Sequence, residues 1–146
     1  MRLFPLLLLA LPASALQLQL DDAQLCGLSS HVVVGEITSS EVRWAEGDEG
    51  GIETHVWLAV DEVVRGPQTD TIHIVLPGGE IDGLRHWVED VPMLVENHSY
   101  TLFLFDTPMG NMIVGGDQGV RYVKPRADRT AVAESVKDSV GSCVAP

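Results

Sequence analysis

The sequence predicts a small, mainly β domain: an antiparallel barrel or curled sheet of five or six strands, flanked by a short helix at each end. Two observations predict this fold class. Short runs rich in β-branched and aromatic residues recur along the chain, separated by clusters of glycine, proline and acidic residues, as is typical of antiparallel strands joined by turns. Apolar residues at helical spacing occur only near the two ends of the segment that follows residue 15.

The first predicted element is a short helix that begins after Asp21 or Asp22 and ends near Ser29. An aspartate at this position can cap the free N–H groups of the first turn. The apolar side of this helix is supplied by a set of four residues: Ala23, Leu25, Cys26 and Leu28.

The first predicted strand covers residues 31–38, where we expect Val32, Val34 and Ile37 to face inward. Gly35 interrupts this β-branched run, which indicates a bulge or a close approach of another backbone. The acidic, glycine-rich residues 46–51 follow and are predicted to form an exposed hairpin loop.

The second and third strands show the clearest alternation. In residues 54–61 one face carries Val56, Leu58 and Val60, and the opposite face carries His55, Trp57 and Asp61. In residues 71–76 the inward set is Ile72, Ile74 and Leu76, so His73 points outward. If these strands are neighbours, the side chains of His55 and His73 approach each other across the sheet.

Residues 80–96 have weak periodicity and contain Gly83, Pro92 and five acidic residues. We expect an ordered but irregular excursion, and long connections of this kind often carry binding surfaces. Gly83 and Trp87 are therefore candidate binding residues, together with Trp57, His55 and His73 on the sheet face.

The remaining chain predicts three more strands, at residues 100–105, 111–114 and 120–123, with turns between them. Residues 129–140 have apolar side chains on one helical face, and Gly141 is placed to cap that helix.

Residues 1–15 have the pattern of a secretory signal peptide: Arg2 gives a positive start, residues 3–11 an apolar core, and Ala13-Ser14-Ala15 a cleavage site. The apolar core is shorter than the roughly 20 residues that a bilayer requires. We therefore expect one domain over residues 16–146, secreted or periplasmic and without a membrane anchor.

Cys26 and Cys143 are the two cysteines of the chain. In an oxidising compartment they are predicted to form a disulfide with each other, which would tie the two helices together. A bridge that closes so long a loop stabilises a fold by about 4 to 5 kcal/mol in the chain-entropy model.

The chain is acidic, with 21 Asp and Glu against nine Lys and Arg and a formal net charge of −12. Loss of Arg2 with the signal peptide makes that charge more negative by one. Nucleic acids and anionic membranes attract clusters of basic residues, so this composition argues against both as partners.

Four segments carry a family resemblance: residues 32–36, residues 63–67, Gly83 and residues 100–104. With these segments the chain resembles secreted bacterial domains of unassigned function, which in turn resemble the netrin-type barrel of tissue inhibitors of metalloproteinases, an OB-like fold. The resemblance implies a five-stranded Greek-key barrel and a secreted protease as a conceivable partner. Those inhibitors chelate the protease zinc with an N-terminal cysteine, whereas Leu16 is the predicted mature start, so no inhibitory residue is transferred.

Two hypotheses about function follow. The chain lacks a nucleophile elbow, a His-Glu-x-x-His zinc motif, a phosphate-binding loop and an EF-hand loop. We therefore expect no cofactor, no metal and a non-enzymatic binding module for a secreted protein, with an accessory role to an exported protease or an envelope protein. The alternative is a small metal-dependent hydrolase whose site combines His55 and His73 with Asp61 or His31. The sequence makes no prediction of oligomeric state.

Overall fold

The computed structural model describes residues 18–47 and 50–123. The predicted signal peptide, the predicted helix at 129–140 and Cys143 lie outside these residues. The described elements are α1 (Asp22–Leu28), β1 (His31–Trp44), β2 (Ile52–Arg65), β3 (Thr71–Pro77), β4 (Gly79–Ile81), β5 (Leu84–His86), β6 (Ser99–Thr107), β7 (Gly110–Ile113), the 3-10 turn η1 (Gly116–Gly119) and β8 (Val120–Val123). The predicted mainly β fold is confirmed.

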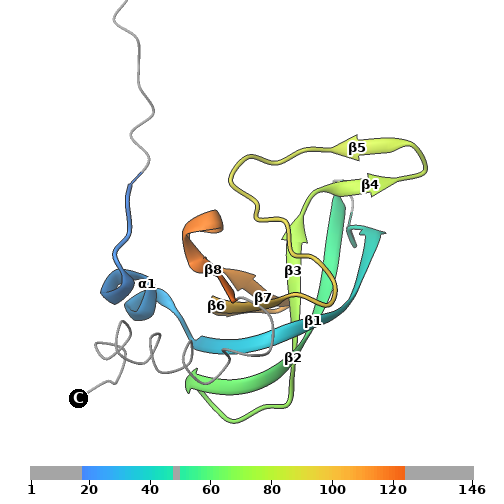
Figure 1. The fold of residues 1–146 in the computed structure, drawn as a ribbon. Helices are drawn as coiled ribbons and strands as arrows, with labels where there is room; N and C mark the ends of the chain where they lie inside the picture. Colours follow the sequence, from blue (N-terminus) through green and yellow to red (C-terminus); the bar gives the residue numbers. More distant parts are fainter. Residues whose placement is uncertain (1–17, 48–49, 124–146) are drawn as a thin grey trace, which may run out of the picture.

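Six strands form one sheet in the order β1-β2-β3-β7-β6-β8, and β1 also pairs with β6. The additional pairing joins β1, β2, β3, β7 and β6 into a barrel-like ring, with β8 alongside β6 (Figure 1). The strands β4 and β5 form a separate two-stranded hairpin that projects beyond the end of β3 (Figure 1).

The sheet is mixed, so the prediction of a wholly antiparallel sheet is wrong at one place. β3 and β7 run parallel and are paired at Ile74 and Asn111, whereas the other pairs of the sheet are antiparallel. The reason is geometric: five strands are an odd number, and directions cannot alternate all the way around a closed ring of odd number. One neighbouring pair must therefore be parallel.

The main core fills the ring. Of the inward positions predicted for the second and third strands, Val56, Leu58, Ile72, Ile74 and Leu76 are buried there and Val60 is partly buried against them, which confirms the assigned faces. They pack against buried side chains from the other elements: Val33, Ile37, Leu94, Tyr100, Leu102, Leu104 and Ile113.

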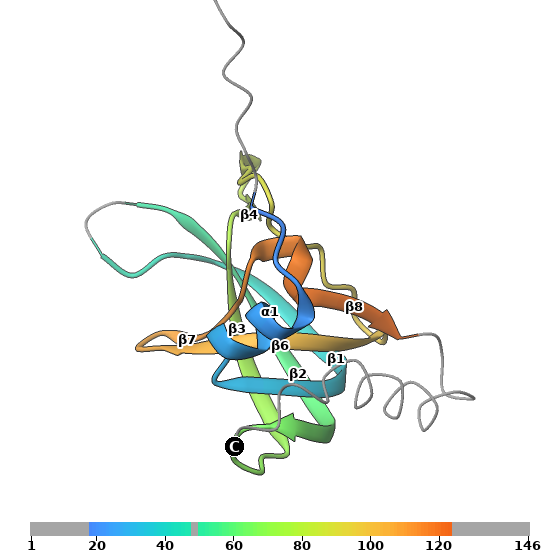
Figure 2. The same cartoon turned by 90° about the vertical axis from the view of Figure 1, so that its left-hand side faces the viewer.

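For β1 the predicted faces are partly wrong. Val33 and Ile37 belong to the main core, whereas Val32 packs outside the ring in a second cluster. That cluster also contains Leu25, Cys26, Phe103 and Val114, and Figure 2 shows α1 lying over β6. Because α1 covers the outer side of this region, both faces of β1 are apolar, and alternation in the sequence does not distinguish inside from outside.

The predicted short helix is confirmed as α1, but its predicted apolar side is only half buried: Leu25 and Cys26 are buried, whereas Ala23 and Leu28 are exposed. The Asp21 carboxylate accepts a hydrogen bond from the Gln24 backbone N–H at 2.8 Å, and the Gln24 side chain accepts one from the Asp21 N–H at 3.0 Å. This reciprocal capping box begins the helix at the predicted position. Cys26 is buried beneath it, and its predicted pairing with Cys143 remains a prediction.

The predicted irregularity at Gly35 is also confirmed. The register between β1 and β2 shifts between Val34 and Gly35. A Cβ at Gly35 would collide with the carbonyl oxygen of Ala59 on β2. Glycine is required here because the two backbones approach too closely for any side chain.

Candidate functional site

The excursion between β3 and β6 is an ordered structure built on a tight hairpin. The turn between β4 and β5 consists of Asp82 and Gly83, both with positive φ, 53° and 77°. Asp-Gly in this conformation is typical of a two-residue type I′ hairpin turn. Gly83, a predicted binding residue, therefore shapes the hairpin, and open space surrounds its Cα.

The hairpin is fixed to the body of the sheet at Gly79. This residue has a φ of 139°, and a Cβ built on it would lie 2.8 Å from both the Thr54 Oγ1 and the Val42 Cγ1. The backbone of β4 therefore packs directly on the side chains of β1 and β2. Close contact of this kind gives the hairpin a defined position relative to the core.

The loop from β5 to β6 is held at several points. The Val95 N–H donates to the Tyr100 hydroxyl at 3.1 Å, and the Asn97 N–H donates to the Ile37 carbonyl at 2.8 Å. At its other end the loop touches η1, because a Cβ on Gly116 would collide with the Asp90 carbonyl oxygen. The prediction of an irregular excursion is therefore wrong for β4 and β5, which form a regular hairpin, and is confirmed for the loop, which is irregular but anchored.

A pocket of about 360 Å³ lies between this loop, the hairpin and the end of β3; we call it the excursion pocket. Leu76 and Leu94, both buried in the main core, belong to its lining. Trp87 and Met93 also line it, and they are 74% and 78% exposed. The apolar lining is completed by Pro77, Val88, Val91 and Pro92.

The second candidate site is on the outer face of β2 and β3, where the predicted approach of His55 and His73 is confirmed. The Nδ1 of His55 lies 2.8 Å from the Nε2 of His73. The ring centroids are 5.0 Å apart and the planes differ by 16°, so the rings meet nearly edge to edge and share one hydrogen bond. Either ring can donate, depending on its tautomer.

Further side chains complete this group, which we call the histidine cluster: Arg43, Glu53, His55, Trp57 and His73. Trp57 lies 5.0 Å from the ring of His73, and the Arg43 guanidinium lies 5.5 Å from the Trp57 ring. The Glu53 carboxylate lies 3.3 Å from the Nε2 of His55, and these two side chains are only 17% and 12% exposed. Each member of the cluster is in contact with another member.

Glu53 and Arg43 were missed in the sequence analysis. Glu53 precedes His55 by two residues on the same strand, so alternation alone places both on one face. Arg43 could not be found in this way, because its neighbours depend on the register between β1 and β2, where Arg43 is opposite Glu53.

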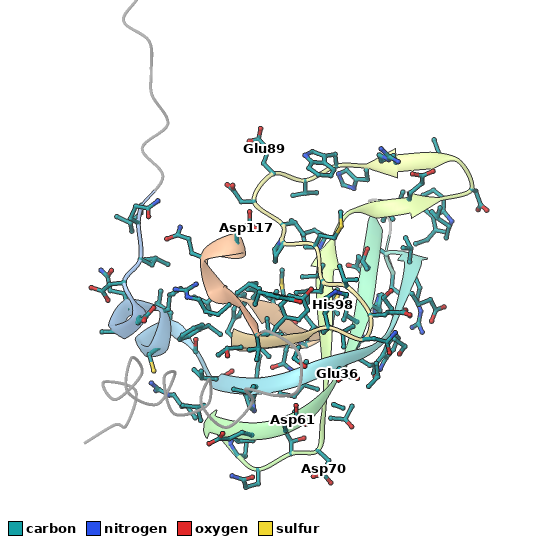
Figure 3. The ribbon with its side chains drawn as sticks, in the orientation of Figure 1. Glu36, Asp61, Asp70, Glu89, His98 and Asp117 are labelled. Carbon is teal, nitrogen blue, oxygen red and sulfur yellow. The ribbon has the colours of Figure 1, made fainter. Side chains whose placement is uncertain are left out.

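The candidate metal ligands do not come together. Asp61 is exposed and lies six residues beyond His55 on β2, a separation of roughly 20 Å along an extended strand. Figure 3 shows Asp61 near Asp70, at the connection between β2 and β3. His31 instead lies 3.4 Å from the Asp106 carboxylate. Within residues 18–47 and 50–123, no group of three or more His, Cys, Asp or Glu side chains could hold a metal ion.

The environment of His73 disfavours its charged form. Burial lowers the pKa of His73 below its ordinary value of 6.5, and the nearby His55 and Arg43 lower it further. His73 is therefore neutral at neutral pH, which is the state in which a histidine ring nitrogen can accept a hydrogen bond.

The chain matches no family model, no curated protein and no solved structure in comparisons with each. The family resemblance therefore remains a prediction, and the geometry carries the argument about function. In the described part of the chain, no helix is long and apolar enough to cross a membrane.

Proposed function

We propose that the protein is a secreted, non-enzymatic binding module that holds a protein partner at the excursion pocket. The observation that carries the proposal is the exposure of Trp87 and Met93 beside a pocket with an apolar floor. Large aromatic and Met side chains are enriched at protein interfaces, and tryptophan is prominent among the residues that dominate binding energy.

The structure of the loop supports this choice. Its hydrogen bonds to β1 and to Tyr100 hold the pocket walls before a partner arrives. A preformed surface binds more tightly than a mobile one, because less conformational entropy is lost on association. The sequence resemblance implies an exported protease as the partner, and an envelope protein is the other partner that this proposal allows.

Capture from the native culture fluid or periplasmic extract tests the proposal. The folded protein is immobilised beside two variants, Trp87→Ala and Leu28→Ala; Leu28 is 59% exposed on α1 and serves as a control for general loss of apolar surface. We expect one partner to be retained by the wild type and by Leu28→Ala, and lost from Trp87→Ala. Equal retention by all three would contradict the proposal.

The alternative, a small metal-dependent hydrolase on the histidine cluster, is tested by metal analysis of the purified protein. Stoichiometric zinc that survives dialysis and is lost in His55→Ala would favour the hydrolase. Mass spectrometry of protein from its native location tests the other two predictions: we expect an N-terminus after residue 15 and no free thiol at Cys26 or Cys143.

A further inference from the structure

We infer that the segment held at the excursion pocket is cationic and inserts one large apolar side chain, with Lys or Arg residues on either side of it. This inference rests on the proposed function and adds the chemistry of the partner. It follows from the size of the pocket and from the charges around it.

The size of the pocket favours a single side chain. Its volume of about 360 Å³ is near the lower end of the roughly 300 to 1,000 Å³ that small-molecule sites occupy. Its floor is made of core side chains, Leu76 and Leu94. An aliphatic or aromatic side chain inserted between Trp87 and Met93 would bury apolar surface on both partners.

The charge near the pocket comes from the excursion, which carries five acidic side chains, Glu80, Asp82, Glu89, Asp90 and Glu96, and a single arginine, Arg85. Glu80 and Arg85 line the pocket itself, whereas the Glu96 carboxylate accepts hydrogen bonds from Ser40 on β1. Arg85 is neutralised locally, because its Nε and Nη2 both donate to the Glu80 carboxylate, at 2.9 and 2.6 Å. Glu89 and Asp90 lie between Val88 and Val91, which line the pocket, so these two carboxylates give its rim a net negative charge.

Two of these carboxylates are well placed to meet a partner. Glu89 and Asp90 are exposed and follow Trp87 closely along the loop. Figure 3 shows the Glu89 side chain directed away from the body of the molecule. A cationic segment would approach such a rim with favourable long-range attraction, which raises the rate of association.

The same charges disfavour other occupants. An acidic segment would be repelled, and so would a second copy of this chain, whose net charge is also −12. Within the described ranges, each arginine of the protein is engaged: Arg43 with Glu41, Arg65 with the Cys26 carbonyl, Arg85 with Glu80 and Arg121 with Asp22. An anionic partner would find few free positive charges there.

The test uses a displayed library of short random peptides, panned on the full-length folded protein with Trp87→Ala as the counter-selection. Synthetic versions of the enriched peptides are then titrated at low and high salt against the wild type, Glu89→Lys and Asp70→Lys. Glu89 and Asp70 are both exposed, and the two replacements change the net charge equally. Asp70 lies at the far end of β3 from the pocket, so Asp70→Lys controls for total charge (Figure 3).

We expect enriched peptides to contain Lys or Arg around one large apolar residue and to bind more weakly as salt increases. Glu89→Lys should weaken binding about fivefold, and Asp70→Lys should have a smaller effect. Circular dichroism confirms that each variant is folded.

Three results would overturn the inference, and they are distinguishable. Neutral or acidic peptides that still depend on Trp87 would remove the cationic partner and leave the proposed binding role intact. Equal weakening by Asp70→Lys and Glu89→Lys would show that the rim has no special part in recognition. Failure of any peptide to discriminate wild type from Trp87→Ala would remove the pocket as a binding site, and with it the proposed function.

Discussion

The histidine cluster and the excursion pocket both contain a tryptophan and charged neighbours, but they differ in what those side chains contact. Trp57 has His73 and Arg43 as ring partners within its own sheet. Trp87 is 74% exposed beside a pocket whose floor is apolar. Groups that already contact one another contribute mainly to the fold, whereas uncovered apolar surface is available to a partner. The comparison therefore leads us to propose Trp87, rather than Trp57, as the binding residue.

The largest effect is expected from Gly79→Ala, which should disrupt the excursion pocket and leave the histidine cluster as the other region of the comparison. The new Cβ would meet Val42 and Thr54, at a backbone φ that disfavours side chains. We expect a loss of about 3 kcal/mol in the free energy of unfolding and loss of peptide binding at the pocket. Urea denaturation measures the first and titration the second.

Gly83→Ala is the matched control for that replacement. It also introduces a side chain at positive φ, but into open space, and should cost only about 1 kcal/mol. Equal losses for the two glycines would show that the contact of β4 with β1 and β2 has no energetic importance.

Exchanging the two tryptophans for alanine sharpens the comparison directly. Trp57→Ala should lower the free energy of unfolding by about 2 kcal/mol, because its contacts with His73 and Arg43 are lost, and should leave partner capture intact. Trp87→Ala should weaken capture at least about 30-fold and change stability by less than about 0.5 kcal/mol. Capture that depends on Trp57 in a fully stable variant would reverse the two assignments.

The smallest effect is a pH dependence located in the histidine cluster. Because the pKa of His73 is lower in the folded protein than its ordinary value of 6.5, the unfolded chain takes up a proton first as the pH falls. Stability should therefore be lost as the pH falls through about 6.5, and the loss should level off below the folded-state pKa of His73.

Denaturation of the wild type and of His73→Gln across this pH range measures the contribution of His73. We expect a shallower fall in stability for the variant, which cannot take up this proton. Identical pH profiles would show that His73 does not respond to pH differently in the folded and unfolded chains.

Much of the fold could be predicted from the sequence because the responsible signals are local. The inward faces of β2 and β3, the capping of α1 by Asp21 and the close approach at Gly35 all follow from residues within a few positions of one another. The approach of His55 to His73 needed one further assumption, that the two strands are neighbours.

The remaining features depend on contacts between distant segments. The apolar Val32 can lie outside the ring because α1 packs over it. The parallel pairing of β3 and β7 follows from closure of the ring and not from the sequence of either strand. The sequence predicted a binding surface only somewhere in residues 80–96, because the periodicity there is weak and the position of the loop is set by contacts with β1, β6 and η1. An irregular loop has no repeating sequence pattern from which the position of a cavity could be predicted.

The parallel junction between β3 and β7 has a dynamic consequence. It is the shortest seam of the ring, with Ile74 and Asn111 as its only register pair, and the nearby Asn111 side chain donates to the His73 carbonyl at 3.4 Å. The amides along this seam should exchange with deuterium sooner than those between β1 and β2, whose register spans most of both strands. His73 lies on β3 at this junction, so its protonation should weaken the pairing of β3 with β7. Mild acid should therefore accelerate deuterium exchange of the amides there before it does so elsewhere in the sheet.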